Sequence, residues 1–230
     1  MFKSITSKRI LAYIVDIFIV TLISSMFAGI EFLNPYLEKQ NEVTIEYNEK
    51  LEEYISQTED INELSNSEFM TDYTYDVSYY GVYTSIITLI VTILYFVVFQ
   101  YYNEGKTIGK ALFDIIVVDK NIKRVKINHL LIRSLIIHSI ITNTILIISI
   151  FLLKKDAFLV ISNIIGIIEM GIIIICIIMI MFREDKRLIH DLLAGTKVIS
   201  REEYEEKQTI KEATILEKNK KKTKKRKDNK

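Results

Sequence analysis

The chain has 230 residues, of which half are hydrophobic, and a formal net charge of +1. A single cysteine excludes an intrachain disulfide and a cysteine-based metal site. The hydrophobic residues are concentrated in four long runs separated by charged connectors. This pattern argues against a soluble globular protein, whose helices are usually shorter and carry a polar face.

The four apolar runs predict membrane-spanning helices. They are residues 10–30, 82–101, 130–153 and 157–182. A span needs about 20 apolar residues, and each run is long enough. The basic residues before the first run resemble the start of a signal peptide, but the run is too long for one and is interrupted by Asp16. We therefore expect an all-α membrane protein with four transmembrane helices, the first of them uncleaved, in a domain covering residues 1–200.

The charges of the connectors predict the orientation of the chain. Residues 31–80 carry thirteen acids and two bases, whereas residues 103–129 carry six bases and three acids. Residues 183–230 carry sixteen bases and ten acids. Basic connectors remain in the cytoplasm. Both termini and loop 103–129 are therefore expected in the cytoplasm, and loop 31–80 outside.

Each loop also has a predicted local structure. In the external loop, Asn34-Pro35 predicts a helix start, with amphipathic helix continuing to about Leu64, and the tyrosine-rich residues 72–80 predict a return to the membrane surface. The acids of this loop fit either a cation-attracting vestibule or a solvated loop. In the cytoplasmic loop, the pattern predicts a short helix at 108–112.

A small cytoplasmic β ribbon is expected after that short helix. Residues 115–118 and 124–127 have strand character around a turn-forming Asp-Lys-Asn, and residues 196–200 have the character of a third strand. The preceding glycines and Lys110 resemble a phosphate loop only faintly, because Ala111 occupies the place of the Ser or Thr that would hold magnesium. We therefore expect no nucleotide and no other cofactor.

Residues 201–230 are predicted to form a disordered basic cytoplasmic tail. Nine of residues 218–230 are lysine or arginine. Such a cluster attracts anionic lipid headgroups at about 1 kcal/mol per residue, and the same charges fix topology. Aromatic residues do not alternate with these charges as they do in single-strand RNA binders, so a nucleic-acid partner is not expected.

Ionisable residues inside the apolar runs are the candidate functional site, because each costs about 2.5–3.5 kcal/mol to insert. Asp16 and His138 fall at similar depths, roughly 10–12 Å from the cytoplasmic edge, at 1.5 Å per residue. Asn143 and Glu169 both fall near roughly 20 Å, close to the midplane. Asp16 paired with His138, and Glu169 paired with Asn143, are the two candidate exchange sites. We expect Asp16 to be the exchanging carboxylate, with Glu169 and His138 as auxiliaries. A structural role, in which ion pairs hold the helices together, is the alternative.

Two arginines are expected to act as electrostatic partners of these groups. Arg9 is seven residues before Asp16, two helical turns away, so both lie on one helix face. Arg133 opens the third run. With three histidines, none at paired ligand spacing, a bound transition metal is not expected.

Several short motifs resemble the RDD family of bacterial membrane proteins, which is named for one arginine and two aspartates. The first run matches the family's opening pattern with Arg9, Ala12 and Asp16. The cytoplasmic loop and the segment after the last run supply the remaining matches: Gly105, Thr107, Gly109, Lys110, Asp119, His190, Asp191, Ala194, Gly195 and Thr196. Asp191 is taken as the second aspartate, with Asp119 as the alternative.

The resemblance implies a compact helical domain in the bacterial inner membrane, and some family members are thought to exchange monovalent cations for protons. Our leading hypothesis is a non-enzymatic monovalent cation/proton transporter or transporter component, working as a homo-oligomer or with a membrane partner. The alternative is a membrane scaffold or assembly partner. A more distant alternative is a lipid-active enzyme using His190 and Asp191. Asp191 is also expected at the cytoplasmic surface, where Arg9, Arg133 or Lys110 would pair with it.

Overall fold

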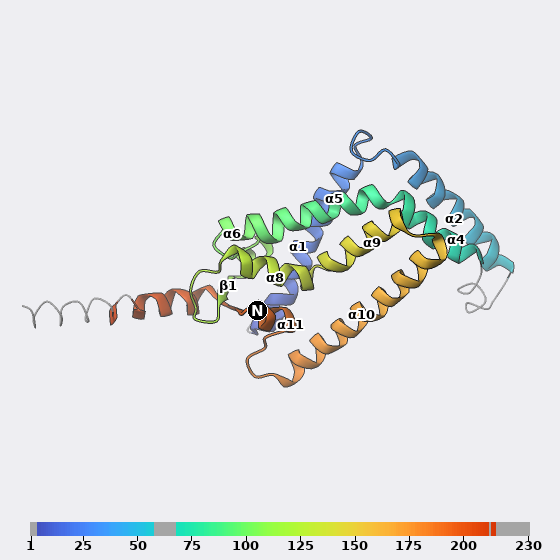
Figure 1. Ribbon diagram of the computed structural model, residues 1–230. Helices are drawn as coiled ribbons and strands as arrows, with labels where there is room; N and C mark the ends of the chain where they lie inside the picture. The colour runs from blue at the N-terminus through green and yellow to red at the C-terminus, as the bar shows by residue number, and fades with distance from the viewer. Residues whose placement is uncertain (1–3, 58–67, 212, 215–230) are drawn as a thin grey trace, which may run out of the picture.

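The computed structural model describes residues 4–57, 68–211 and 213–214, and these form a helical bundle with a small sheet at one end (Figure 1). The first helix, α1(Ile5–Ala28), starts where the Ser4 side chain accepts a hydrogen bond from the Thr6 N–H. The remaining helices are α2(Leu37–Gln57), α4(Glu68–Tyr80), α5(Val82–Ile93), the π-helix η1(Leu94–Phe99), α6(Gln100–Tyr102), α7(Ile108–Leu112), α8(Ile127–Ile137), α9(Ile140–Leu152), α10(Lys155–Phe182) and α11(Ile189–Leu193).

Three of the described helical segments are long and apolar enough to cross a membrane. They are α1, the continuous segment 82–102 formed by α5, η1 and α6, and α10. A fourth span exists only if α8 and α9, which meet at a bend of 62°, are counted together. The predicted third span over 130–153, and with it the count of four, therefore holds only if this bent pair is counted as one span.

The bend lies at His138-Ser139, and the backbone explains it. Ser139 has a φ of 52°, in the left-handed region, which no α-helix can continue through. Near the break, the Thr142 hydroxyl oxygen lies 3.0 Å from the Ser139 carbonyl oxygen. The break places His138 and Ser139 where side chains of neighbouring helices can reach them.

The sheet has two strands rather than the expected ribbon of three. β1(Ile115–Asp119) pairs antiparallel with β2(Thr196–Ser200), with Ile115 opposite Ser200 and Asp119 opposite Thr196. The predicted strand at 124–127 contributes only an isolated bridge, between Arg124 and Val118, because helix α8 already begins at Ile127. The predicted short helix at 108–112 is present as α7.

The acidic segment forms two helices at the other end of the bundle from the sheet (Figure 1). Helix α2 begins at Leu37, so Asn34 is not its N-cap; the buried Asn34 side chain donates instead to the Ala28 carbonyl at 3.1 Å. The expected continuation of α2 to Leu64 lies outside the described residues after Gln57. Residues 72–80 belong to α4, whose Tyr73 stacks on Tyr47 of α2 at 3.4 Å between ring centroids.

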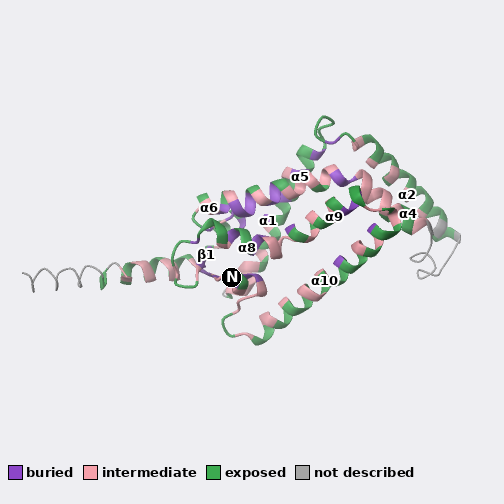
Figure 2. Cartoon of the chain, in the orientation of Figure 1, coloured by how far each residue is buried: buried purple, intermediate pink, exposed green. Residues whose placement is uncertain are grey.

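Helix α10 is the least covered of the long helices. Its buried residues are Phe158 and Ile165, both in its first half, and it packs against α9 and α4 near that end. Figure 2 shows the rest of α10 largely exposed. In a bilayer these exposed isoleucines face lipid, which removes the penalty that they would carry in water.

The C-terminal segment differs from expectation in its first part. Residues 201–211 are helical, so the prediction that disorder begins at 201 is wrong there. The lysine-rich residues 218–230, on which the prediction of lipid binding by the tail rests, lie outside the described residues.

Candidate functional site

Asp16 of α1 is fully buried and is surrounded by donors from two other segments. Its Oδ1 accepts from the Tyr95 hydroxyl at 2.7 Å and from the Gly109 N–H at 2.8 Å. Its Oδ2 accepts from the Thr107 hydroxyl at 2.5 Å and lies 3.5 Å from Lys110 Nζ. Both oxygens of this carboxylate therefore accept hydrogen bonds from within the protein.

The local backbone explains how these donors reach Asp16. Thr107 caps the N-terminus of α7 by accepting from the Lys110 N–H. In the same turn the Gly109 N–H donates to Asp16, and the Ile108 N–H donates to the Tyr95 hydroxyl. Gly109 is needed for the approach, since a Cβ there would lie 2.2 Å from the Ala12 carbonyl oxygen and 2.7 Å from Asp16 Oδ1. Tyr95 lies in the π-helical turn η1, a deviation that is frequent at functional sites.

Asp191 of α11 is the second fully buried carboxylate, and two arginines bind it. Arg9 Nη2 donates to its Oδ2 at 2.6 Å, and Arg133 Nη1 pairs with its Oδ1. The Leu188 N–H donates to Oδ2 at 3.2 Å, and the Thr196 hydroxyl lies 3.4 Å from Oδ1. Asp191 therefore ties together α1, α8 and the segment that follows α10.

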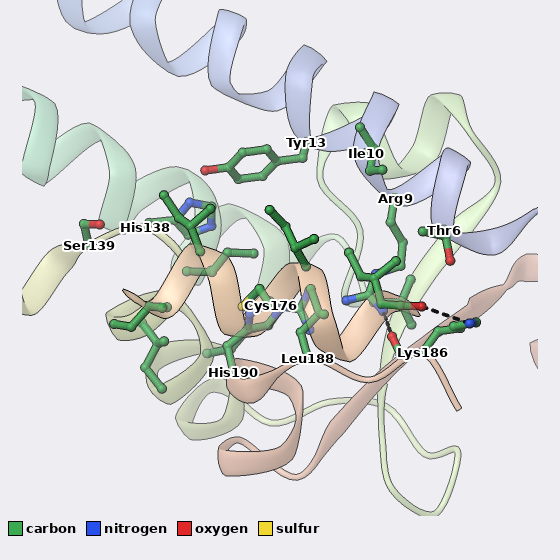
Figure 3. A pocket seen from close by; sticks show the side chains of 18 of the residues that line it. Thr6, Arg9, Ile10, Tyr13, His138, Ser139, Cys176, Lys186, Leu188 and His190 are labelled. Carbon is green, nitrogen blue, oxygen red and sulfur yellow. Dashed lines mark hydrogen bonds between the residues drawn. The ribbon is translucent and has the colours of Figure 1, made fainter. Parts of the chain in front are cut away.

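A cavity of about 400 Å³ lies between α10, α1 and the break between α8 and α9. Figure 3 shows Ser139 and His138 at one end, Cys176 and His190 near the middle, and Arg9, Thr6 and Lys186 at the other end. Its charged lining residues are Arg9, Lys110, Arg133, Glu169 and Lys186, and isoleucines of α10 form much of the rest. The cavity is therefore amphipathic.

The pattern of one arginine and two buried aspartates agrees with a comparison against protein families. The model of the RDD family matches residues 5–195, which is most of the chain. The chain belongs to the RDD family. Searches among curated proteins and among solved structures found no significant match.

The motif residues of this RDD chain gather at the sheet end of the bundle. Gly105 adopts a φ of +89° and approaches the Val117 carbonyl so closely that a Cβ would lie 2.4 Å from it. Gly195 has a φ of +63°, and its carbonyl accepts from the Lys120 N–H at 3.0 Å. Asp119 accepts from the backbone N–H groups of Asn121 and Lys123, so it orders a turn, whereas Asp191 binds the arginines.

The expected pairing of Asp16 with His138 is not present. Asp16 faces Tyr95, Thr107 and Lys110, while the His138 ring stacks on Phe96 at 3.5 Å between centroids. Arg9 and Arg133 likewise bind Asp191 rather than Asp16. The depths estimated from the sequence did not reveal the partners of Asp16, because the loop that carries Thr107 folds back against α1.

The expected pairing of Glu169 with Asn143 is also wrong. The Thr142 hydroxyl donates to Glu169 Oε1 at 2.5 Å, and Asn143, the next residue of α9, is exposed. The bend before α9 rotates this helix relative to a straight continuation of α8, so a neighbouring position faces α10. Glu169 has no ion pair within the described part of the chain and lines the cavity.

Two further groups near the site lie outside the spans and have shifted pKa values. Burial lowers the pKa of Lys110 to about 8, an effect that the charge of Asp16 opposes. Burial, followed by the charges of Arg133 and Arg9, holds the pKa of His190 far below its ordinary value of 6.5, so His190 is neutral at pH 7. The described residues hold no group of three His, Cys, Asp or Glu side chains suited to a metal ion.

Sequence reasoning missed Tyr95 as the partner of Asp16. Its hydroxyl is one of the few polar groups in the second apolar run, and that signal was available. The pairing itself was not predictable from spacing, since seventy-nine positions separate the two residues.

Proposed function

We propose that this RDD protein is a non-enzymatic membrane transporter, or a transporter component, that exchanges a monovalent cation for protons, and that Glu169 is the exchanging carboxylate. The observation that carries the proposal is the position of Glu169. It lies at the middle of α10, lines the cavity, and has a hydroxyl donor but no basic partner among the described residues. A carboxylate at that depth without a fixed cation can alternate between a proton and a metal cation.

Asp16 takes a different role in this proposal from the one that sequence position suggests. Its oxygens are occupied by Tyr95, Thr107 and Gly109, and Lys110 lies within ion-pair distance. A cation would have to displace these donors before it bound. We therefore assign Asp16 to holding α7 against α1, and Glu169 to exchange.

The experiment is proton flux in proteoliposomes under an imposed pH gradient, with sodium, potassium or lithium added. Wild type is expected to show cation-dependent flux, and Glu169→Gln to fall to the level of protein-free vesicles. The matched control is Glu184→Gln, because Glu184 is exposed and lies after the end of α10. Thr142→Val, which removes the hydroxyl donor, is expected to shift the pH dependence of flux. Unchanged flux in Glu169→Gln contradicts the assignment.

A scaffold or assembly partner is the second candidate, and one observation favours it. Both fully buried carboxylates, Asp16 and Asp191, are occupied by contacts within the chain. If folded wild type gives no flux above protein-free vesicles with any of the three cations, transport is excluded for them and the scaffold proposal replaces it. Cross-linking in membranes would then identify whether a second copy or another membrane protein is the partner.

The proposed orientation places both termini in the cytoplasm of a bacterial inner membrane. It is supported by the acidic helices α2 and α4 lying at one end of the bundle and the basic segments at the other (Figure 1). In a Cys176→Ser background, Ser56→Cys in α2 should react with an impermeant thiol reagent from outside intact cells. Labelling only after the membrane is opened would reverse the orientation.

A further inference from the structure

The cavity holds two buried histidine nitrogens without a partner. His190 is 2% exposed, and its Nε2 has no hydrogen bond in the structure; the nearest carboxylate oxygen, Oδ2 of Asp191, is 3.7 Å away. His138 Nδ1 is also buried without a hydrogen bond. Both residues line the cavity. Buried polar atoms normally have partners, so the orphan nitrogen of His190, beside two arginines, indicates a ligand that would supply one.

The charges around His190 indicate the sign of that ligand. Arg9 and Arg133 share one carboxylate, Asp191, so this cluster carries one excess positive charge. Lys110 does not change that balance, because it lies against Asp16. The hydrogen bonds of Arg133 within the described residues all come from Nη1, so its Nε and Nη2 groups have no partner there. An uncompensated buried cation is costly, and an anion would compensate it.

The walls of the cavity indicate that the anion is part of an amphiphile. The cavity extends along α10 from Glu169 to Ile180, eleven residues and roughly 16 Å at the helical rise. Along that length the α10 side is formed mainly by Ile172, Ile173 and Ile177, and α1 contributes Ile10. An inorganic anion would need only the polar end, whereas an acyl chain would fill the apolar part.

We propose that this cavity binds one anionic phospholipid, with its phosphate against Arg9, Arg133 and His190 and an acyl chain along the isoleucines of α10. The neutral His190 donates from Nε2 to a phosphate oxygen in the tautomer that places the proton there. Lys186 lies at the same end of the cavity as Arg9 and adds a further cation near the headgroup (Figure 3). This site is separate from the lysine-rich tail. It shares its cavity with Glu169, which lies eleven residues along α10 from Ile180.

The test is native mass spectrometry of delipidated full-length protein in a neutral detergent, with phosphatidylglycerol, phosphatidylcholine or inorganic phosphate added. We expect one tightly bound phosphatidylglycerol per chain and weaker binding of the other two probes. Lys186→Gln should weaken phosphatidylglycerol binding about fivefold, the effect of one cation near an anionic headgroup. Equal binding of phosphatidylcholine would overturn the headgroup assignment, and tight binding of inorganic phosphate would overturn the lipid assignment.

A matched pair of variants tests the acyl-chain part. Ile177 lines the cavity and Ile178, the next residue, does not, although both are about half exposed. Ile177→Trp should therefore fill the cavity and abolish the bound lipid, while Ile178→Trp retains it. Because both positions lie on an exposed part of α10, folding should be preserved in both, which circular dichroism checks. Equal retention of lipid by the two variants would place the lipid elsewhere.

Discussion

The sheet end of the bundle and the middle of α10 surround their carboxylates differently. At the sheet end, Asp16 and Asp191 are fully buried, and each accepts several hydrogen bonds with cations at hand. In α10, Glu169 is partly exposed to a cavity and has one hydroxyl donor. A carboxylate occupied on every side holds segments of the fold together, whereas the proposed exchange needs a carboxylate with an open side and no fixed cation.

The largest effect is expected when the Asp191 cluster is broken. Asp191→Asn leaves Arg9 and Arg133 buried with no anion between them, and losing one partner of a buried ion pair costs about 3–5 kcal/mol. We expect a large drop in the temperature at which helical circular dichroism is lost. The control is Asp185→Asn, which removes an exposed pair with Arg183. Equal, small effects of both substitutions would show that the cluster does not hold the bundle together.

A smaller effect is expected from crowding the Asp16 site without changing its charge. In Gly109→Ala the new methyl group would meet the Ala12 carbonyl and the Asp16 carboxylate, so α7 must move, at a cost of roughly 1–3 kcal/mol. Gly171→Ala in α10 is the matched control, because no atom lies within 4 Å of a Cβ built there. The same thermal measurement should separate the two. A neutral Gly109→Ala would mean that α7 does not need its close approach to α1.

The apolar runs were sufficient to predict most of the long helical segments, and the resemblance of short motifs was sufficient for the family. Long apolar runs predict helices because each backbone group must be satisfied internally in lipid, and that constraint does not depend on partners. The bend at Ser139 was not predictable, since neither proline nor glycine marks it. Its left-handed φ is a tertiary effect, fixed by how α8 and α9 pack separately.

The candidate residues were predictable individually, but their partners were not. Depth along a helix indicates only which residues lie at similar heights. It contains no information about rotation around each helix axis or about loops that fold back. For that reason the prediction paired Asp16 with His138, whereas its partners in the structure include Thr107 and Lys110. It likewise paired Glu169 with Asn143, whereas the partner is the neighbouring Thr142.

The smallest effect is expected in how the stability of the folded protein depends on pH through Lys110. Its pKa is about 8 in the folded protein and 10.5 ordinarily, so between these values the unfolded chain binds a proton that the folded chain does not. Stability contributed by this group therefore rises as pH rises from 8 towards 10.5. Lys110→Met removes the contribution, so wild type should gain stability relative to the variant across that interval.

Comparison with Lys123→Met isolates this contribution, because Lys123 is exposed and every other titrating group is shared by the two variants. The measurement is the thermal midpoint at several pH values from 8 upwards for wild type and both variants. The stability difference between wild type and Lys110→Met should grow with pH, and that between wild type and Lys123→Met should not. Parallel curves for all three proteins would mean that Lys110 retains its proton beside Asp16 throughout this interval. Lys110 and Asp16 would then form an ion pair at every pH in this interval.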